Sequence, residues 1–195
     1  MEKVKKKRTN PGKGSNFERS VSKKLSLWLS GGEDDSWVWR TSSSGARAKT
    51  RAKQGKATSN SSGDLKAENP KAFVIFENCS WELKNGYGTY CLLDLIDKKS
   101  KNPKQVEKFF LQAKEDCKNA NVKYPILVLK RDRCCEIVGI PTELFSFLWK
   151  QGSKPSQCER IQVRGSSIMC PMTFLALDNF LSWCRPSFFE GSENE

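Results

Sequence analysis

The sequence has no histidine among its 195 residues and no pair of cysteines in a Cys-x-x-Cys arrangement. The missing imidazole excludes Ser-His-Asp triads and every other mechanism that depends on histidine as a proton carrier. Protein zinc sites are built mainly from cysteine and histidine, so a zinc centre is not expected either. The function is therefore sought among mechanisms that need no imidazole.

A long uninterrupted apolar segment is also missing. The longest candidate, Ile168 to Leu177, is broken by Pro171 and Thr173 and is too short to span a bilayer. The basic N-terminus is followed by no apolar stretch of the kind found in secretory signals. We therefore expect no membrane span and an intracellular, cytoplasmic protein. In that compartment we expect reduced thiols, buried because they fall in apolar runs, at Cys79, Cys91, Cys117, Cys134, Cys135, Cys158, Cys170 and Cys184.

Positive charge, in contrast, is abundant. The chain has 34 lysines and arginines against 22 acidic residues, a formal net charge of +12. Such a surface attracts polyanions, and nucleic acid is the commonest soluble one, with an anionic membrane surface as the competing partner. The chain is long enough for one packed domain, which we place at residues 14–186, between a basic arm (1–13) and a polar tail (187–195).

The charge gathers in two segments that lack apolar periodicity. The arm at residues 1–13 is either a solubility tail or a contact for phosphates. Residues 41–62 are rich in Ser, Gly, Ala, Lys and Arg and predict a long mobile loop, a kind that is usually functional or disordered. The centre of this loop contains no acid, and its candidate DNA-binding residues are Arg47, Lys49, Arg51, Lys53 and Lys56.

Hydrophobic periodicity predicts alternating helices and strands. Apolar stripes or proline starts predict helices over Ser15–Ser30, from Asn102 to Cys117, from Pro141 to Trp149 and from Pro171 to Leu181. Strands are expected at Ser36–Arg40, Trp81–Lys84, Tyr124–Leu129, Cys134–Ile140 and, weakly, Ile161–Val163. Tyr124–Leu129 is almost entirely apolar, which is typical of a strand covered on both faces.

The stretch from Gly63 to Lys84 carries the candidate chemistry. Asp64 follows a glycine, and Glu82 and Lys84 stand two residues apart at the end of an apolar run. If Trp81–Lys84 is a strand, the period of two places Glu82 and Lys84 on one face and Trp81 and Leu83 on the other. The first face would carry chemistry and the second would join the core.

A third carboxylate, Glu18, lies beside the apolar stripe of the first helix. Its side chain can lean toward whatever the helix packs against. Ser15-x-x-Glu18 also fits a capping box, in which Glu18 would only accept a hydrogen bond from the Ser15 backbone amide. Both interpretations remain open on sequence alone.

Gly63-Asp64 and Glu82-Leu83-Lys84 together resemble the PD-(D/E)xK nuclease superfamily, with support from Glu18, Arg40 and Ser44-Gly45. Among its branches the chain is most similar to archaeal and phage Holliday-junction resolvases and resolvase-like phage nucleases. The likeness covers residues 14–140. Gly63 replaces the proline of the family motif, and the basic insert before it is longer than in compact resolvases. The resemblance implies an α/β restriction-endonuclease-like fold, a mixed β-sheet flanked by helices.

The same resemblance implies a Mg²⁺-dependent endonuclease, with Mn²⁺ as a substitute ion and 5′-phosphate products. Asp64, Glu82 and the Leu83 carbonyl would supply hard oxygen ligands, which magnesium prefers. Glu18 would hold a metal-bound water or a second ion, and Lys84 would orient the attacking water or stabilise charge. Arg40 and Ser44 would contact the substrate. The expected partner is branched DNA, cut by a homodimer, in the host cytoplasm if the chain is phage-encoded.

Two other functions fit the same residues. One is a restriction- or repair-type nuclease that cuts linear duplex DNA. The other is a non-catalytic DNA-binding protein that uses the basic arm and loop alone, with Asp64 and Glu82 as ordinary charges paired with Lys66 and Lys84. A cross-strand ion pair of that kind would contribute only about 0.2–1 kcal/mol.

Overall fold

A computed structural model describes residues 12–41, 63–86, 105–152, 160–163 and 171–190 of the chain. Residues 1–11 of the predicted arm, most of the basic loop, Cys91–Ile96 and the Asn102-Pro103 helix start lie outside the described residues, whereas residues 12 and 13 of the arm already belong to the first helix. The helices are α1 (Gly12–Ser30), α3 (Phe73–Asn78), α4 (Gln105–Ala120), α5 (Thr142–Gln151) and α6 (Leu177–Trp183), with short 3-10 helices η1 (Pro70–Ala72) and η3 (Pro186–Phe189). The strands are β1 (Val38–Arg40), β2 (Leu65–Ala67), β3 (Cys79–Asn85), β4 (Tyr124–Lys130), β5 (Ile137–Pro141), β6 (Arg160–Val163) and β7 (Met172–Ala176).

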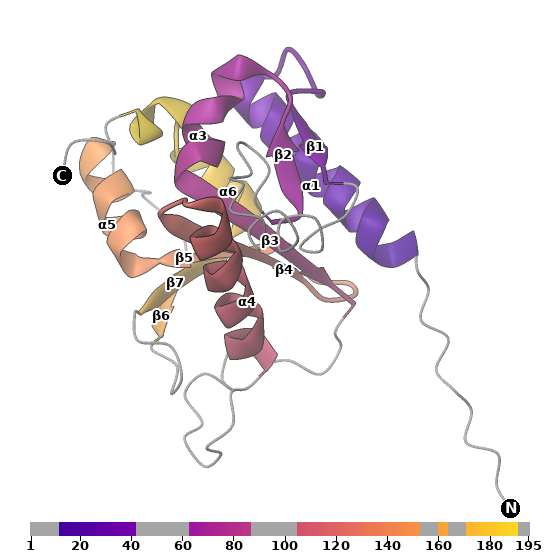
Figure 1. Ribbon diagram of the computed structural model, residues 1–195, viewed down its shortest axis with the longest axis vertical. Helices are drawn as coiled ribbons and strands as arrows, with labels where there is room; N and C mark the ends of the chain where they lie inside the picture. The colour runs from indigo at the N-terminus through magenta and orange to yellow at the C-terminus, as the bar shows by residue number, and fades with distance from the viewer. Residues whose placement is uncertain (1–11, 42–62, 87–104, 153–159, 164–170, 191–195) are drawn as a thin grey trace, which may run out of the picture.

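Five of these strands form one mixed sheet in the order β3-β4-β5-β7-β6 (Figure 1). β3 and β4 are parallel, and the other neighbours are antiparallel. β1 and β2 form a separate antiparallel ribbon, which meets the outer edge of β3 through a parallel bridge between Gly63 and Trp81. The expected α/β fold, a mixed sheet flanked by helices, is confirmed.

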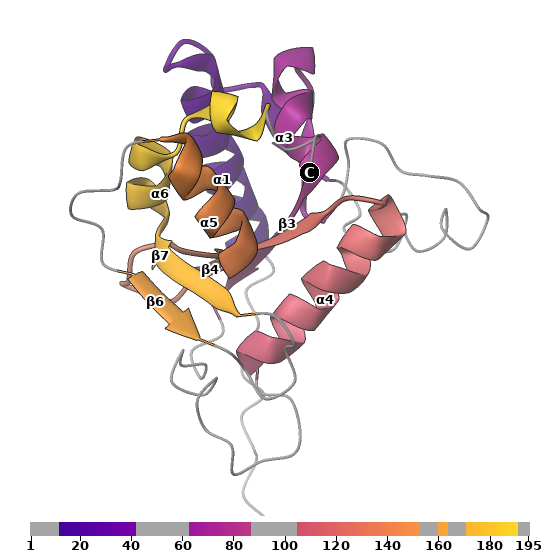
Figure 2. The same cartoon turned by 90° about the vertical axis from the view of Figure 1, so that its left-hand side faces the viewer.

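The sheet is covered on both faces, as the apolar sequence of β4 predicts. Ile126 and Val128 face the larger core, which also contains residues of α1, α5 and α6, whereas Leu127 and Leu129 face α4. Figure 2 shows α4 alone on one side of the sheet and the other long helices across from it. The predicted stripe of α4 is buried at Val106, Phe109, Phe110, Ala113 and Cys117. β3 lies at the edge of the sheet, and its successive side chains therefore point alternately into the two layers.

The expected helix from Pro171 is wrong in its first half. Met172–Ala176 is strand β7, and the helix begins only at Leu177. The spacing of Phe174, Leu177 and Phe180 fits a helix, but the segment MTFLA is apolar enough to be a strand with both faces buried. It pairs with β5 and β6, which satisfies its backbone groups in the middle of the sheet.

Three further expectations need correction. The strand expected at Cys134–Ile140 starts at Ile137, and Cys134 and Cys135 are exposed in the turn before it, whereas Cys79, Cys117 and Cys184 are buried free thiols. The apolar run before Cys79 is helix α3, for which no helix is predicted. The predicted polar tail at 187–195 begins with an apolar part, because Ser187–Phe189 belong to η3 and Phe189 is fully buried with its ring 6.5 Å from that of Trp28. No described helix is long and apolar enough to cross a membrane.

Candidate active site

A backbone contact attaches Asp64 to β3. The Asp64 amide donates to the Trp81 carbonyl at 2.8 Å, and the Thr41 amide donates to the Asp64 carbonyl at 2.9 Å. Gly63 has φ +76°, and a Cβ at this position would overlap the Trp81 carbonyl oxygen. Only glycine combines this backbone conformation with so close an approach. The glycine before Asp64 therefore has a direct structural cause.

The Asp64 carboxylate lies at the outer edge of β3, the edge away from β4. Its Oδ2 accepts a hydrogen bond from the Leu83 amide at 2.8 Å, and the residue is only 6% exposed. The N–H and C=O groups of one strand residue point to the same side of the strand. The Leu83 carbonyl consequently faces the same edge as the Asp64 carboxylate.

Glu82 is buried on the face of β3 that α4 covers, opposite the face that carries Trp81 and Leu83. Its Oε1 accepts a hydrogen bond from Gln112 Nε2 at 2.8 Å and also contacts Lys84 Nζ. Burial and the negative charge of Asp64 raise the pKa of Glu82 to about 7, although Lys84 acts in the opposite direction. Asp64 and Glu82 are thus within range of mutual electrostatic repulsion.

Lys84 follows on the same face as Glu82, as the period of two predicts. Its ammonium group lies 5.5 Å from the centre of the Phe109 ring, and its side chain is 14% exposed. The aromatic face and the Glu82 carboxylate both favour a charged amine there. Lys84 is thus a largely buried cation directly beside a buried carboxylate.

Glu18 reaches the same region from α1. The helix begins at Gly12, which places Ser15 inside it and not at the N-cap, and Glu18 Oε2 instead accepts a hydrogen bond from Arg40 Nη1 at 3.2 Å. Burial and the charge of Asp64 raise the pKa of Glu18, while Arg40 and Lys84 oppose this rise. Glu18 and Glu82 therefore each lie within electrostatic reach of Asp64 and Lys84.

Other predicted site residues lie outside the described part of the chain: Ser44, Arg47, Lys49, Arg51, Lys53 and Lys56. Two residues near the site are not among the predicted ones. Gln112 holds Glu82 from α4, and Thr41 donates to the Gly63 carbonyl through Oγ1 at 3.1 Å. No sequence signal marks Gln112, because its contact depends on which face of the sheet α4 covers.

The donor set at this point consists of hard oxygens. Asp64, Glu82 and the Leu83 carbonyl suit Mg²⁺ or a similar divalent cation. A bound cation would also relieve the electrostatic repulsion between the two carboxylates. Within the described ranges, however, no group of three or more His, Cys, Asp or Glu side chains is arranged to hold a metal ion. Glu18 is directed to Arg40, and Glu82 is directed to Lys84 and Gln112. The residue types fit a divalent ion, and Glu18 and Glu82 are engaged with neighbouring side chains.

Comparison with known protein families identifies a related family. A family model described as phage putative PDDEXK endonuclease matches residues 9–187, nearly the whole chain. Nucleases of this type generally use divalent metals. The match concerns the endonuclease family and says nothing of Holliday junctions. No curated protein and no solved structure matched the chain.

Proposed function

Because the chain belongs to the phage putative PDDEXK endonuclease family, we propose that it is a Mg²⁺-dependent endonuclease that hydrolyses phosphodiester bonds in DNA. The observation that carries the proposal is the position of Asp64. Its carboxylate is hydrogen-bonded to the backbone of the residue between Glu82 and Lys84. Two buried carboxylates and one largely buried amine are thus grouped around a single residue of an edge strand.

The residues have separate roles in this proposal. Asp64, Glu82 and the Leu83 carbonyl would hold the divalent ion, which, when bound, would neutralise charge that builds on the phosphoryl oxygens. Lys84 donates a hydrogen bond to the attacking water or to a phosphoryl oxygen, a role for which it must remain protonated. The Glu82 carboxylate lies directly beside it. Glu18 accepts a hydrogen bond from a water at the site, and Arg40 orients Glu18 and contacts the substrate.

The finer part of the proposal concerns the substrate. Branched DNA is favoured by the resemblance of Gly63-Asp64, Glu82-x-Lys84 and the preceding Arg40 to resolvases. Resolution of a four-way junction needs two opposed nicks, so the active form would be a symmetric dimer. The net charge of +12 supports DNA as the partner but does not select among its forms.

The test uses labelled DNA of matched sequence. A four-way junction and a linear duplex are each incubated with the protein and Mg²⁺, with Mn²⁺ as an alternative ion. EDTA and Glu82→Ala serve as controls. We expect cleavage of the junction in preference to the duplex, lost in both controls. Cleavage that persists in EDTA and in Glu82→Ala would contradict the mechanism, and faster cutting of the duplex would favour the restriction- or repair-type function.

Calorimetry separates the nuclease from a non-catalytic DNA-binding protein. A metal site should bind Mg²⁺ in a manner that depends on Asp64, and bound ion should stabilise the fold by RT ln(1 + [Mg²⁺]/Kd). Asp64→Asn should lose both effects. DNA binding without any Asp64-dependent uptake of Mg²⁺ would indicate the non-catalytic function.

A further inference from the structure

The turn between β4 and β5 carries two arginines that the candidate site does not use. Arg131 and Arg133 are both exposed. We propose that these two side chains bind phosphates of the DNA backbone next to the site, an inference that rests on the proposed nuclease function. The turn would then hold the substrate strand against the edge of β3.

The segment Arg131-Asp132-Arg133 carries two positive charges and one negative charge, and the next acid along the chain is engaged by other residues. Glu136 is 8% exposed and accepts hydrogen bonds from Lys130 at 2.5 Å and from Lys24 at 3.2 Å. Arg131 and Arg133 form no ion pair with any residue in the described ranges. Their guanidinium groups therefore remain available to an external anion, and the planar guanidinium suits phosphate.

The register of the sheet places this turn beside the candidate site. Lys84 is the partner of Leu129, and Asn85 is the partner of Lys130, in the parallel pair β3–β4. From the ~4.8 Å spacing of paired strands and the ~3.3 Å rise per residue, the Arg131 Cα, two residues beyond Leu129, lies about 8 Å from the Lys84 Cα. The Gly86 amide donates to the Lys130 carbonyl, which ties the end of β3 to the start of the turn. A phosphate bound at this turn would therefore be close enough to help position a DNA strand at Lys84.

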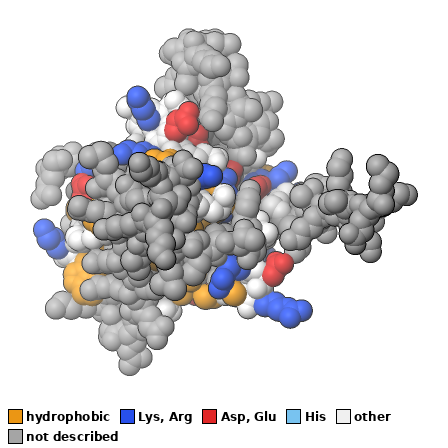
Figure 3. All heavy atoms as spheres, turned by 90° about the horizontal axis from the view of Figure 1, so that it is seen from below, with side chains coloured by type: hydrophobic (Ala, Val, Ile, Leu, Met, Phe, Trp, Pro, Cys, Tyr) orange, Lys and Arg blue, Asp and Glu red, His pale blue; other side chains and the backbone are white. Residues whose placement is uncertain are grey.

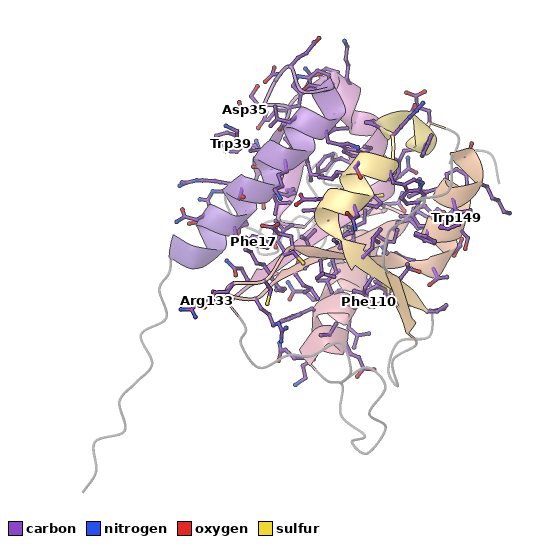
Figure 4. The ribbon with its side chains drawn as sticks, turned by 180° about the vertical axis from the view of Figure 1, so that it is seen from behind. Phe17, Asp35, Trp39, Phe110, Arg133 and Trp149 are labelled. Atoms are coloured by element: carbon purple, nitrogen blue, oxygen red, sulfur yellow. The ribbon has the colours of Figure 1, made fainter. Side chains whose placement is uncertain are left out.

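The backbone of Arg133 points to a function for its side chain. Its φ is +63°, the left-handed region, and the only other described non-glycine residue there is Asn121, a type that tolerates it. For a residue with a longer side chain this conformation costs about 1–2 kcal/mol, which glycine would avoid. Strained backbone of this kind persists mostly where the side chain is used. In Figure 4 the labelled Arg133 points away from the body of the molecule.

Total charge alone would not have selected this turn. In Figure 3 the visible lysine and arginine side chains are spread around the rim of one face and do not form one patch. Exposed Arg185, before η3, is an example of a basic residue outside the β4–β5 turn. The β4–β5 turn is distinguished by its link to the end of β3 and by the strained Arg133. Arg185 therefore provides a matched control.

The test compares Arg133→Gly, Arg131→Ala and Arg185→Ala with the parent protein. Binding of a fluorescein-labelled DNA duplex is measured by anisotropy in EDTA at several salt concentrations, and thermal unfolding is measured for each variant. Arg133→Gly and Arg131→Ala should each weaken binding by roughly threefold to tenfold, and each should reduce the slope of log K against log [salt] by about 0.9. Arg185→Ala should bind as the parent does. Arg133→Gly should unfold at the same temperature as the parent or higher, since it relieves the backbone.

The outcomes separate this inference from the nuclease proposal. If the parent cleaves DNA with Mg²⁺ and both turn variants bind as tightly as the parent with the same salt slope, the inference is wrong and the nuclease proposal stands. If Arg185→Ala loses as much affinity as they do, binding depends on net charge alone and the inference is also wrong. If the parent neither binds nor cleaves DNA, both proposals are wrong.

Discussion

The Asp64 carboxylate accepts its hydrogen bond from the backbone of Leu83 and not from a side chain, at 2.8 Å. The strand that carries Glu82 and Lys84 therefore sets the position of Asp64, although the two segments are separated by the whole of β2 and α3. Substitutions at Asp64 can consequently be divided into those that keep this hydrogen bond and those that lose it.

Asp64→Asn should abolish cleavage while leaving the fold nearly intact. The asparagine carbonyl can still accept from the Leu83 amide, whereas the charge that a divalent ion needs is gone. Asp64→Ala should be less stable than Asp64→Asn by about 1 kcal/mol, because it leaves the buried Leu83 amide without that acceptor. Urea unfolding in EDTA measures the difference, and cleavage assays should find both variants at least about 100-fold slower than the parent. Substantial cleavage by Asp64→Asn would remove Asp64 from the mechanism.

Gly63→Ala should destabilise the protein and inactivate it. Alanine at φ +76° costs about 1–2 kcal/mol, and its methyl group must also displace the Trp81 carbonyl, at a further cost of about 1–3 kcal/mol. Gly31→Ala is the matched control, since Gly31 has φ +69° with open space around its Cα. Urea unfolding of both variants isolates the cost of the close approach. Equal losses in the two variants would show that the Gly63–Trp81 contact is unimportant.

Glu136 predicts a pH dependence of stability that does not involve the site. Burial alone would raise the pKa of Glu136, but hydrogen bonds from Lys130 and Lys24 outweigh it and lower the pKa below the usual 4.5. A carboxyl whose pKa is lower in the folded state stabilises the protein above its unfolded pKa and loses this contribution as the pH falls through the folded value. Glu136→Gln should therefore lower the free energy of unfolding by about 1–2 kcal/mol at pH 7, and the difference from the parent should shrink as the pH falls below 4.5.

Thermal unfolding of Glu136→Gln and of the parent, measured between about pH 3 and pH 8, would test this. The range extends to both sides of the ordinary carboxyl pKa of about 4. Asp178→Asn is the control. Asp178 also accepts from Lys24, at 2.7 Å, but its side chain is 69% exposed, so its loss should cost less than about 0.5 kcal/mol. A difference between Glu136→Gln and the parent that stays constant across the range would contradict the lowered pKa.

The sequence predicts well those helices and strands whose apolar pattern is complete within the segment itself. β4 is apolar at every position that the two core layers need, and the α4 stripe is buried at each expected residue. The segment after Pro171 was predicted wrongly because Phe174, Leu177 and Phe180 fit helical spacing although β5 and β6 pair with its first half. Pairing between strands distant in sequence overrides local preference, and it cannot be derived from one segment.

The candidate site likewise combines features that follow from local sequence with features that depend on distant segments. The period of two correctly placed Glu82 and Lys84 on one face of β3, since it follows from strand geometry alone. The covering of that face by α4, and with it the Gln112 contact, depends on the crossover between β3 and β4. The glycine before Asp64 was recognised only as a departure from a motif, and its cause is the approach of the Trp81 carbonyl. The roles of these residues in catalysis remain predictions.

Arg40→Ala should reduce activity far more than stability. The Arg40–Glu18 pair is partly exposed, with side chains 30% and 21% accessible, so its loss should cost less than about 1 kcal/mol. Loss of Arg40 also removes the two strongest influences that lower the pKa of Glu18, so that pKa should rise further. If Glu18 works as a carboxylate at the site, cleavage at neutral pH should fall at least about tenfold and recover partly at higher pH. Lys23→Ala, which breaks the pair between Lys23 of α1 and Asp35 of the segment after this helix, is the control and should cleave at the parent rate. Equal activity of Arg40→Ala and Lys23→Ala would mean that the Arg40–Glu18 pair is only a surface ion pair.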